Sequence, residues 1–90
     1  MARKRERLEV IRDILNAIRN NREIKPTRLL YASNLSPQMF KDYVDELLNK
    51  DFVEIITKDK EKKFFKLKRR GNDFLEEYKI IENFVENFGL

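Results

Sequence analysis

The sequence predicts an α+β fold class that is mostly helical, with three short helices, a two-stranded hairpin and a final amphipathic helix. Apolar residues recur at helical spacing near both ends of the chain, and two β-prone runs flank a highly charged segment. A Ser-Pro pair between these regions marks a helix start. Ninety residues form one small domain with a marginal core, so we expect association with a partner to stabilise it.

The first half of the chain predicts three helices. Apolar spacing indicates a helix over residues 6–20. Pro26 opens a short second helix, in which we expect Leu29 and Leu30 to be buried. A third helix spans residues 36–50, with Ser36 as its N-cap and Pro37 at its first helical position. About three residues separate the second helix from the third, which is the spacing of a helix-turn-helix.

The second half predicts a hairpin followed by a pairing helix. Residues 52–56 and 64–67 form β-prone runs, and the charged residues 58–63 between them form the exposed tip. In the last helix, one set of apolar residues repeats at spacings of four, three, four and three, the pattern of a coiled-coil seam. This set is Phe74, Tyr78, Ile81, Val85 and Phe88, which we predict to form a dimer interface.

Gly89 supplies a left-handed position that ends the last helix, with Leu90 folding back toward Val85. We therefore divide the chain into a helix-turn-helix domain over residues 1–70 and a dimerisation helix over residues 71–90. A helix-turn-helix followed by a hairpin and a further helix is the element order of a winged helix-turn-helix, in which the hairpin is called the wing.

The composition excludes several classes of function. The chain has no cysteine and no histidine, so disulfides, thiolate chemistry, imidazole catalysis and the usual structural zinc sites are excluded. The carboxylate pairs Asp45-Glu46 and Glu76-Glu77 are adjacent in sequence and so diverge around a helix. We therefore predict no enzyme activity, no metal, no cofactor and no small-molecule ligand.

The expected location of the protein follows from the lengths of its apolar runs. No apolar run approaches the roughly 18 residues that a membrane span needs, and no signal-like apolar segment follows the basic start. We expect a cytoplasmic protein that is associated with the nucleoid and has no membrane partner.

Positive charge is concentrated in two segments. Residues 1–7 and 58–70 hold twelve of the twenty Lys and Arg but only three of the sixteen Asp and Glu. Residues 72–90 reverse this balance, with five acids and one lysine. The phosphate backbone of double-stranded DNA attracts the cations of the wing and of residues 1–7, which we call the arm. The acid-rich residues 72–90 instead suit pairing with a second copy of the chain.

Short motifs along the chain carry a resemblance to a known family: Asn34-Leu35-Ser36, Asp45-Glu46-Leu47, Gly71, Phe74-Leu75-Glu76-Glu77-Tyr78 and Phe88-Gly89-Leu90. The chain resembles small basic archaeal DNA-binding proteins in which a winged helix dimerises through an antiparallel coiled coil of the C-terminal helix. The resemblance implies a DNA-binding homodimer with a chromatin-associated or transcription-regulating role. Asp51 stands where the family usually has glycine, so this turn must tolerate a positive φ or take another shape.

We expect DNA contacts from four regions, namely the arm, the start of the second helix, the third helix and the wing. The outward face of the third helix is poor in cations and carries Asp42 and Asp45, which phosphate repels, so most affinity should come from the other three regions. The expected contact residues are Arg3, Lys4, Arg5, Lys25, Thr27, Arg28, Ser36, Gln38, Lys41, Lys58, Lys60, Lys62 and Lys63.

Two alternatives stay open. The outward Asp42 and Asp45, together with Met39, also suit a winged helix that docks another protein. Binding of RNA or single-stranded DNA is a third interpretation, and it needs bases to stack on Phe64 or Tyr31. We expect both of these aromatic residues to be core or half-core, which disfavours this interpretation.

Overall fold

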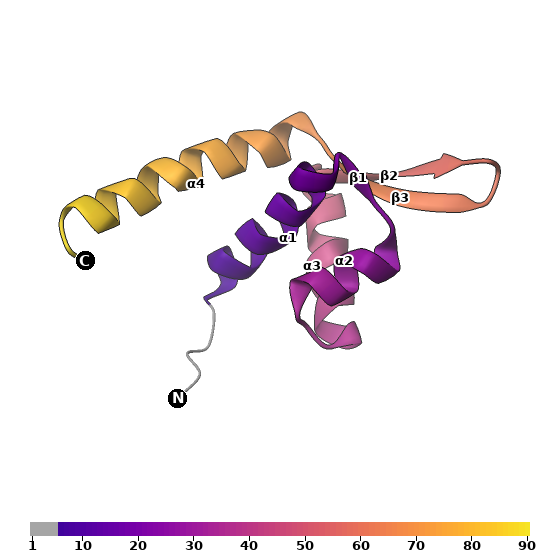
Figure 1. Ribbon diagram of the computed structural model, residues 1–90, viewed down its shortest axis with the longest axis horizontal. Coiled ribbons are helices and arrows are strands. Elements are labelled where there is room, and N and C mark those ends of the chain that lie inside the picture. Colours follow the sequence, from indigo (N-terminus) through magenta and orange to yellow (C-terminus); the bar gives the residue numbers. More distant parts are fainter. Residues whose placement is uncertain (1–5) are drawn as a thin grey trace.

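The computed structural model describes residues 6–90 of the chain. In Figure 1 the helices of the first half of the chain pack together, the hairpin projects to one side and the last helix extends to the other. The elements, in order, are α1 (Arg7–Asn21), β1 (Glu23–Ile24), α2 (Pro26–Ser33), α3 (Pro37–Asn49), β2 (Val53–Lys58), β3 (Lys62–Leu67) and α4 (Arg69–Asn87).

The predicted helix starts in the helix-turn-helix are confirmed. Pro26 and Pro37 stand in the first turns of α2 and α3, where a missing N–H costs nothing. The Ser36 hydroxyl accepts a hydrogen bond of 3.2 Å from the Met39 backbone N–H and so caps α3. Between the two helices, Asn34 takes a left-handed conformation that asparagine tolerates well.

The sheet has three strands rather than the predicted two, in the order β1-β3-β2. The additional strand, β1, pairs Glu23 with Lys66 and Ile24 with Phe65 in an antiparallel ladder. The sequence prediction missed β1 because a strand of two residues is too short to show an alternating pattern. Its Ile24 side chain is buried in the core.

The wing is longer and its tip is tighter than predicted. β2 extends to Lys58 and β3 begins at Lys62, so the strands include half of the segment 58–63 that was assigned to the loop. Asp59 and Lys60 make the turn with φ angles of 51° and 69°. Positive φ at two successive residues is the geometry of tight hairpin turns, which usually recruit asparagine and glycine.

The core lies where α1, α2 and α3 meet the base of the wing. Ile14, Leu15, Ile18, Leu29 and Leu47 are almost fully buried. Phe65 of β3 and Leu75 of α4 join them, as does the partly buried Phe40, whose ring meets that of Phe65 edge-on at 6.4 Å. Among the helices of residues 6–90, none combines the length and apolar character needed to cross a bilayer.

Both ends of α4 follow from local chemistry. The helix begins at Arg69, two residues before the start of the predicted dimerisation helix at residue 71, with Lys68 as an extended N-cap. At the other end, the Leu90 N–H donates to the Val85 carbonyl at 2.9 Å while Gly89 has a φ of 70°. The predicted glycine-terminated ending is confirmed. Of the two shapes left open for the turn at Asp51, the structure has the positive φ, at 65°.

Candidate nucleic-acid interface

Two side chains on the outward face of α3, those of Gln38 and Lys41, are able to hydrogen-bond to base edges. Each is bonded to an acid one turn further along the same helix. Gln38 Nε2 donates to Asp42 Oδ1 at 3.1 Å, and Lys41 Nζ lies 2.8 Å from Asp45 Oδ2. The hydrogen bond to Asp45 raises the pKa of Lys41. Each of the two side chains is thus already bonded to a carboxylate of its own helix.

Glu46 ties α3 to the start of α1. Its carboxylate accepts hydrogen bonds from Arg7 on α1 and, at 2.8 Å, from Lys50 on its own helix. These two cations lower the pKa of Glu46 to about 2. The role of Glu46 in joining two helices could not be read from local spacing, because Arg7 is far from it along the chain.

The start of α2 presents Lys25, Thr27 and Arg28 to solvent. Lys25 is the extended N-cap of the helix and its side chain makes no capping bond. The first N–H groups of a helix and its dipole favour anions, so cations here add to an existing positive potential. These three residues and Ser36, the N-cap of α3, lie on the helix-turn-helix as expected.

All four predicted wing lysines are exposed. Lys58 differs from the others, because it forms an ion pair with Glu23 of β1 and its ammonium lies 5.6 Å from the centre of the Phe64 ring. Lys60, Lys62 and Lys63 have no carboxylate partner within the described part of the chain. The pairing of Lys58 depends on β1, which explains why the sequence analysis treated the four lysines alike.

The β ladder places the wing lysines on two faces. Lys62 pairs with Lys58 and Lys63 pairs with Thr57, and successive side chains on a strand point to opposite faces. Lys63 therefore shares its face with the buried Phe65, the side on which the helices pack. Lys58 and Lys62 lie on the opposite face, which we call the outer face of the wing.

The predicted arm residues Arg3, Lys4 and Arg5 lie outside the described residues. The following segment is defined, since Arg7 pairs with Glu46 and thus holds the start of α1 beside α3.

Tyr31 corrects one expectation. Its side chain was expected to be buried or half-buried, but 79% of the surface of this α2 residue is exposed. α2 has only eight residues and buries Leu29 and Ser33, so Tyr31 faces away from the packed side. Phe64 is half-buried, as expected.

Three further cations near β1 were not singled out from the sequence. Arg19 and Arg22 stand at the end of α1, and Lys66 is exposed on β3 beside Glu23. No local signal could have grouped them, because only the sheet pairing brings the end of α1 against the wing.

The predicted dimer residues fall into two groups. Phe74 and Tyr78 stack on each other within the protomer, with ring centres 5.6 Å apart, and Phe74 also contacts the Phe52 ring. Ile81, Val85 and Phe88 are exposed, and we call them the α4 stripe.

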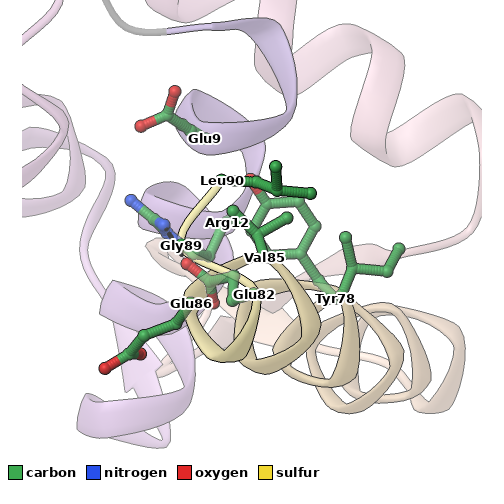
Figure 2. A pocket seen from close by; sticks show the side chains of 9 residues that line it. Glu9, Arg12, Tyr78, Glu82, Val85, Glu86, Gly89 and Leu90 are labelled. Atoms are coloured by element: carbon green, nitrogen blue, oxygen red, sulfur yellow. Dashed lines mark hydrogen bonds and ion pairs between the residues drawn. The ribbon is translucent and has the colours of Figure 1, made fainter.

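Beside the α4 stripe lies a groove of about 370 Å³ between α1 and α4. In Figure 2, Tyr78, Val85 and Leu90 gather on the side of α4 that faces α1, while Glu9 and Glu86 lie at the rim. An open apolar wall of this kind suits another helix better than a charged ligand.

These elements define a class. A helix-turn-helix on a three-stranded sheet, with a projecting hairpin and a trailing helix, is a winged helix-turn-helix domain. A family model described as "Winged helix-turn-helix" matches residues 4–86, and the chain belongs to this family.

Two relatives come from the archaeon Methanocaldococcus jannaschii. Uncharacterized protein MJ0287 is 42% identical over 59 residues, which cover 66% of this chain and 57% of the relative. Uncharacterized protein MJ0290 is 38% identical over 50 residues, which cover 56% of this chain and 23% of the relative. The match thus spans only part of the length of each relative.

Solved structures share the fold at low identity. Sso10a-2, a DNA-binding protein from Sulfolobus solfataricus, has a TM-score of 0.77 at 20% identity, covering 93% of this chain and 85% of its own. A MarR family transcriptional regulator from Silicibacter pomeroyi has a TM-score of 0.73 at 21% identity, covering 89% of this chain and 56% of its own. The predicted mostly helical winged fold is thereby confirmed.

Proposed function

We propose that a homodimer of this chain binds double-stranded DNA, mainly through phosphate contacts, as a transcription regulator or a chromatin-associated protein. The observation that carries this proposal is the wing tip, where Lys60, Lys62 and Lys63 are exposed and unneutralised by any carboxylate of residues 6–90. Clustered cations beside a helix-turn-helix match the charge of a duplex backbone. The printed description of Sso10a-2 as DNA-binding adds support from a protein of the same fold.

Phosphate contact, rather than base readout, is favoured by the pairing on α3. Gln38 and Lys41 each have an acidic partner on the same face, so a base edge must compete with a carboxylate that is already in place. Asp42 and Asp45 also face the phosphates that flank any base. We therefore propose that the wing, the start of α2 and the arm supply affinity, and that sequence preference is weak.

A second copy is the proposed occupant of the α4 stripe. Ile81 and Phe88 are 57% and 68% exposed, and Phe84 and Ile80 extend the apolar surface beside them. Exposed side chains of this size, spaced as a coiled-coil seam, gain free energy when an identical helix covers them. The family resemblance indicates an antiparallel arrangement, in which the partner's α4 would also cover the groove beside Tyr78.

The DNA proposal is tested by fluorescence anisotropy with a labelled random duplex over a series of salt concentrations. We expect log K to fall with log salt at a slope of about −4 to −7 for two protomers, since each phosphate neutralised contributes about −0.9. Replacing Lys60, Lys62 and Lys63 by glutamate should abolish binding without unfolding the domain.

Two single variants provide a matched comparison, because Lys63→Glu and Lys79→Glu change the charge equally. Lys63 lies on the wing, whereas Lys79 is exposed on α4. We expect only Lys63→Glu to weaken binding strongly. A triple wing variant that binds as tightly as the parent would refute the assignment of the wing.

Sedimentation equilibrium tests the dimer. Ile81→Asp combined with Phe88→Asp places charges in the α4 stripe and should convert the dimer to a monomer. Asn83→Asp adds a charge to an exposed position of the same helix outside the stripe and should leave the dimer intact. A parent protein that sediments as a monomer at micromolar concentration would rule out the dimer.

One observation favours a second candidate, a winged helix that docks a protein. Met39 is 46% exposed on α3, close in sequence to the outward Asp42 and Asp45. An exposed thioether rimmed by acids suits a basic, partly apolar peptide. A gel shift at low salt separates the two candidates, because such a module leaves random duplex DNA unmoved.

A further inference from the structure

The second groove of the molecule lies between the end of α1 and the base of the wing. It has a volume of about 630 Å³ and forms where the end of α1 and β1 meet the base of the hairpin. We call it the outer-wing groove. Four cations and one carboxylate line it, namely Arg19, Arg22, Lys58, Lys66 and Glu23.

The internal ion pairs leave part of this positive charge unneutralised. Lys58 pairs with Glu23, and Arg19 lies 3.2 Å from Glu76 of α4. Arg22 and Lys66 form no ion pair within residues 6–90, and Lys66 stands on the outer face between its cross-strand neighbours Glu23 and Glu54. The groove therefore presents a guanidinium and an ammonium that attract an anion.

The backbone at Arg22 gives a second reason to expect a ligand. Arg22 ends α1 with a φ of 62°, a region in which an L-residue other than glycine, asparagine or aspartate is strained. Its backbone N–H bonds to the Arg19 carbonyl at 3.3 Å, an interaction that glycine would make equally well. Since its guanidinium gains no hydrogen bond within residues 6–90, the fold alone does not account for an arginine here.

The outer-wing groove is separate from the outward face of α3, which carries Gln38 and Lys41. In the β3 ladder, Lys66 shares the outer face with Lys62 and Phe64, whereas Phe65 points to the core on which α3 packs. Lys62 and Lys66 are four residues apart on one strand, so these two cations are about 13 Å apart along the outer face, with Phe64 between them. That length exceeds a single phosphate and suits a chain of them.

We propose that the outer-wing groove is a second phosphate site, which takes the phosphodiester backbone of nucleic acid on the face opposite the helix-turn-helix. Arg22 supplies a planar guanidinium able to hold one phosphate through two hydrogen bonds, and Lys66 and Lys62 follow the backbone as point charges. This site does not require the dimer or the α3 contacts, although both sites share the positive field of the wing.

The test is lysine footprinting of the full chain, with an acetylating reagent at single-hit levels and mass spectrometry. Saturating duplex DNA should slow acetylation of Lys66 by about threefold or more, alongside protection of Lys63 on the other face. Lys79 on α4 serves as the internal control and should react at its free rate. If no lysine is protected, the proposed function itself fails. If Lys63 is protected but Lys66 reacts at its free rate, only the second site is overturned.

A variant and a second probe sharpen the result. Arg22→Gly suits the positive φ and so preserves the backbone, and it should return Lys66 to within about twofold of its free rate while Lys63 stays protected. Unchanged protection of Lys66 in this variant removes Arg22 from the site. Inorganic tripolyphosphate distinguishes the source of the phosphate, since protection of Lys66 by this anion but not by duplex overturns the nucleic-acid assignment.

Discussion

The ammonium of Lys41 lies 2.8 Å from the Asp45 carboxylate, one helical turn further along the outward face of α3. Asp45 thereby occupies a cation that would otherwise contact DNA, and it also brings a negative charge toward the duplex. Both effects oppose DNA binding through α3. An exposed pair of this kind contributes little to folding, so it is exchanged at little cost.

Asp45→Asn is therefore expected to strengthen binding to random duplex by about two- to fivefold at low salt, the scale of one exposed charge interaction. Anisotropy titration measures the change. Glu77→Gln on α4 is the matched control, because it removes one negative charge from another exposed position. Equal gains in both variants would show that net charge, rather than the Lys41 pairing, sets the affinity.

The Glu46 carboxylate predicts a pH dependence of stability. Its folded pKa of about 2 lies below the value in the unfolded chain, because Arg7 and Lys50 hold the charged form. Stability from this group is thus fully present above about pH 4.5 and is lost as the pH falls toward 2. Solvent screening of this partly exposed group limits the loss to about 1 kcal/mol.

Urea unfolding of the parent and of Glu46→Gln at several pH values measures this contribution. The variant should be less stable near pH 6, and the difference in unfolding free energy should shrink toward zero near pH 2. The comparison of two chains cancels the titration of the other acids. A difference that does not change with pH would mean that Glu46 acts through packing instead of charge.

The wing turn predicts opposite effects on stability and on binding. Lys60 has a φ of 69°, which glycine adopts without strain, so Lys60→Gly should raise the unfolding free energy by up to about 1 kcal/mol. The same change removes a wing cation and should weaken DNA binding. Thermal unfolding and anisotropy measure the two effects. Lys60→Ala removes the charge but keeps the strain, so a stability gain equal to that of Lys60→Gly would contradict the backbone argument.

Replacing Gly71 by alanine should lower the free energy of unfolding, although helix propensity alone predicts an increase. A Cβ at this position would lie 2.7 Å from the Leu67 Cδ1 atom and would overlap the Phe52 carbonyl oxygen. We expect Gly71→Ala to cost about 1 to 3 kcal/mol through overpacking, more than the roughly 1 kcal/mol that alanine adds in a helix. Lys79→Ala on the exposed side of α4 should be nearly neutral in the same thermal unfolding assay. A stabilised Gly71→Ala chain would show that α4 shifts freely relative to the wing.

The sequence predicted much of the fold because its signals are local. Ser36 and Pro37 mark the start of α3 within a few residues, and Gly89 ends α4 by its own conformational freedom. The apolar spacing along α4 is also read from the sequence alone. Such signals need no knowledge of what the helix packs against.

The candidate site was predicted less completely, for a physical reason that Tyr31 and Lys58 illustrate. α2 is too short for its period to say which aromatic faces the core, so Tyr31 was misplaced. Lys58 was taken as a free wing cation, but it pairs with Glu23, a residue far from it along the chain.

The sequence by itself determined the order of the elements, the cationic wing and the apolar spacing of the last helix, because each depends on residues that are neighbours in the chain. Only the tertiary structure decided which lysines share a face and where the outer-wing groove lies. The shared faces follow from the register of β2 and β3. The groove depends on β1, whose pairing of Glu23 with Lys66 involves a strand that is distant in sequence and leaves no trace in the local pattern.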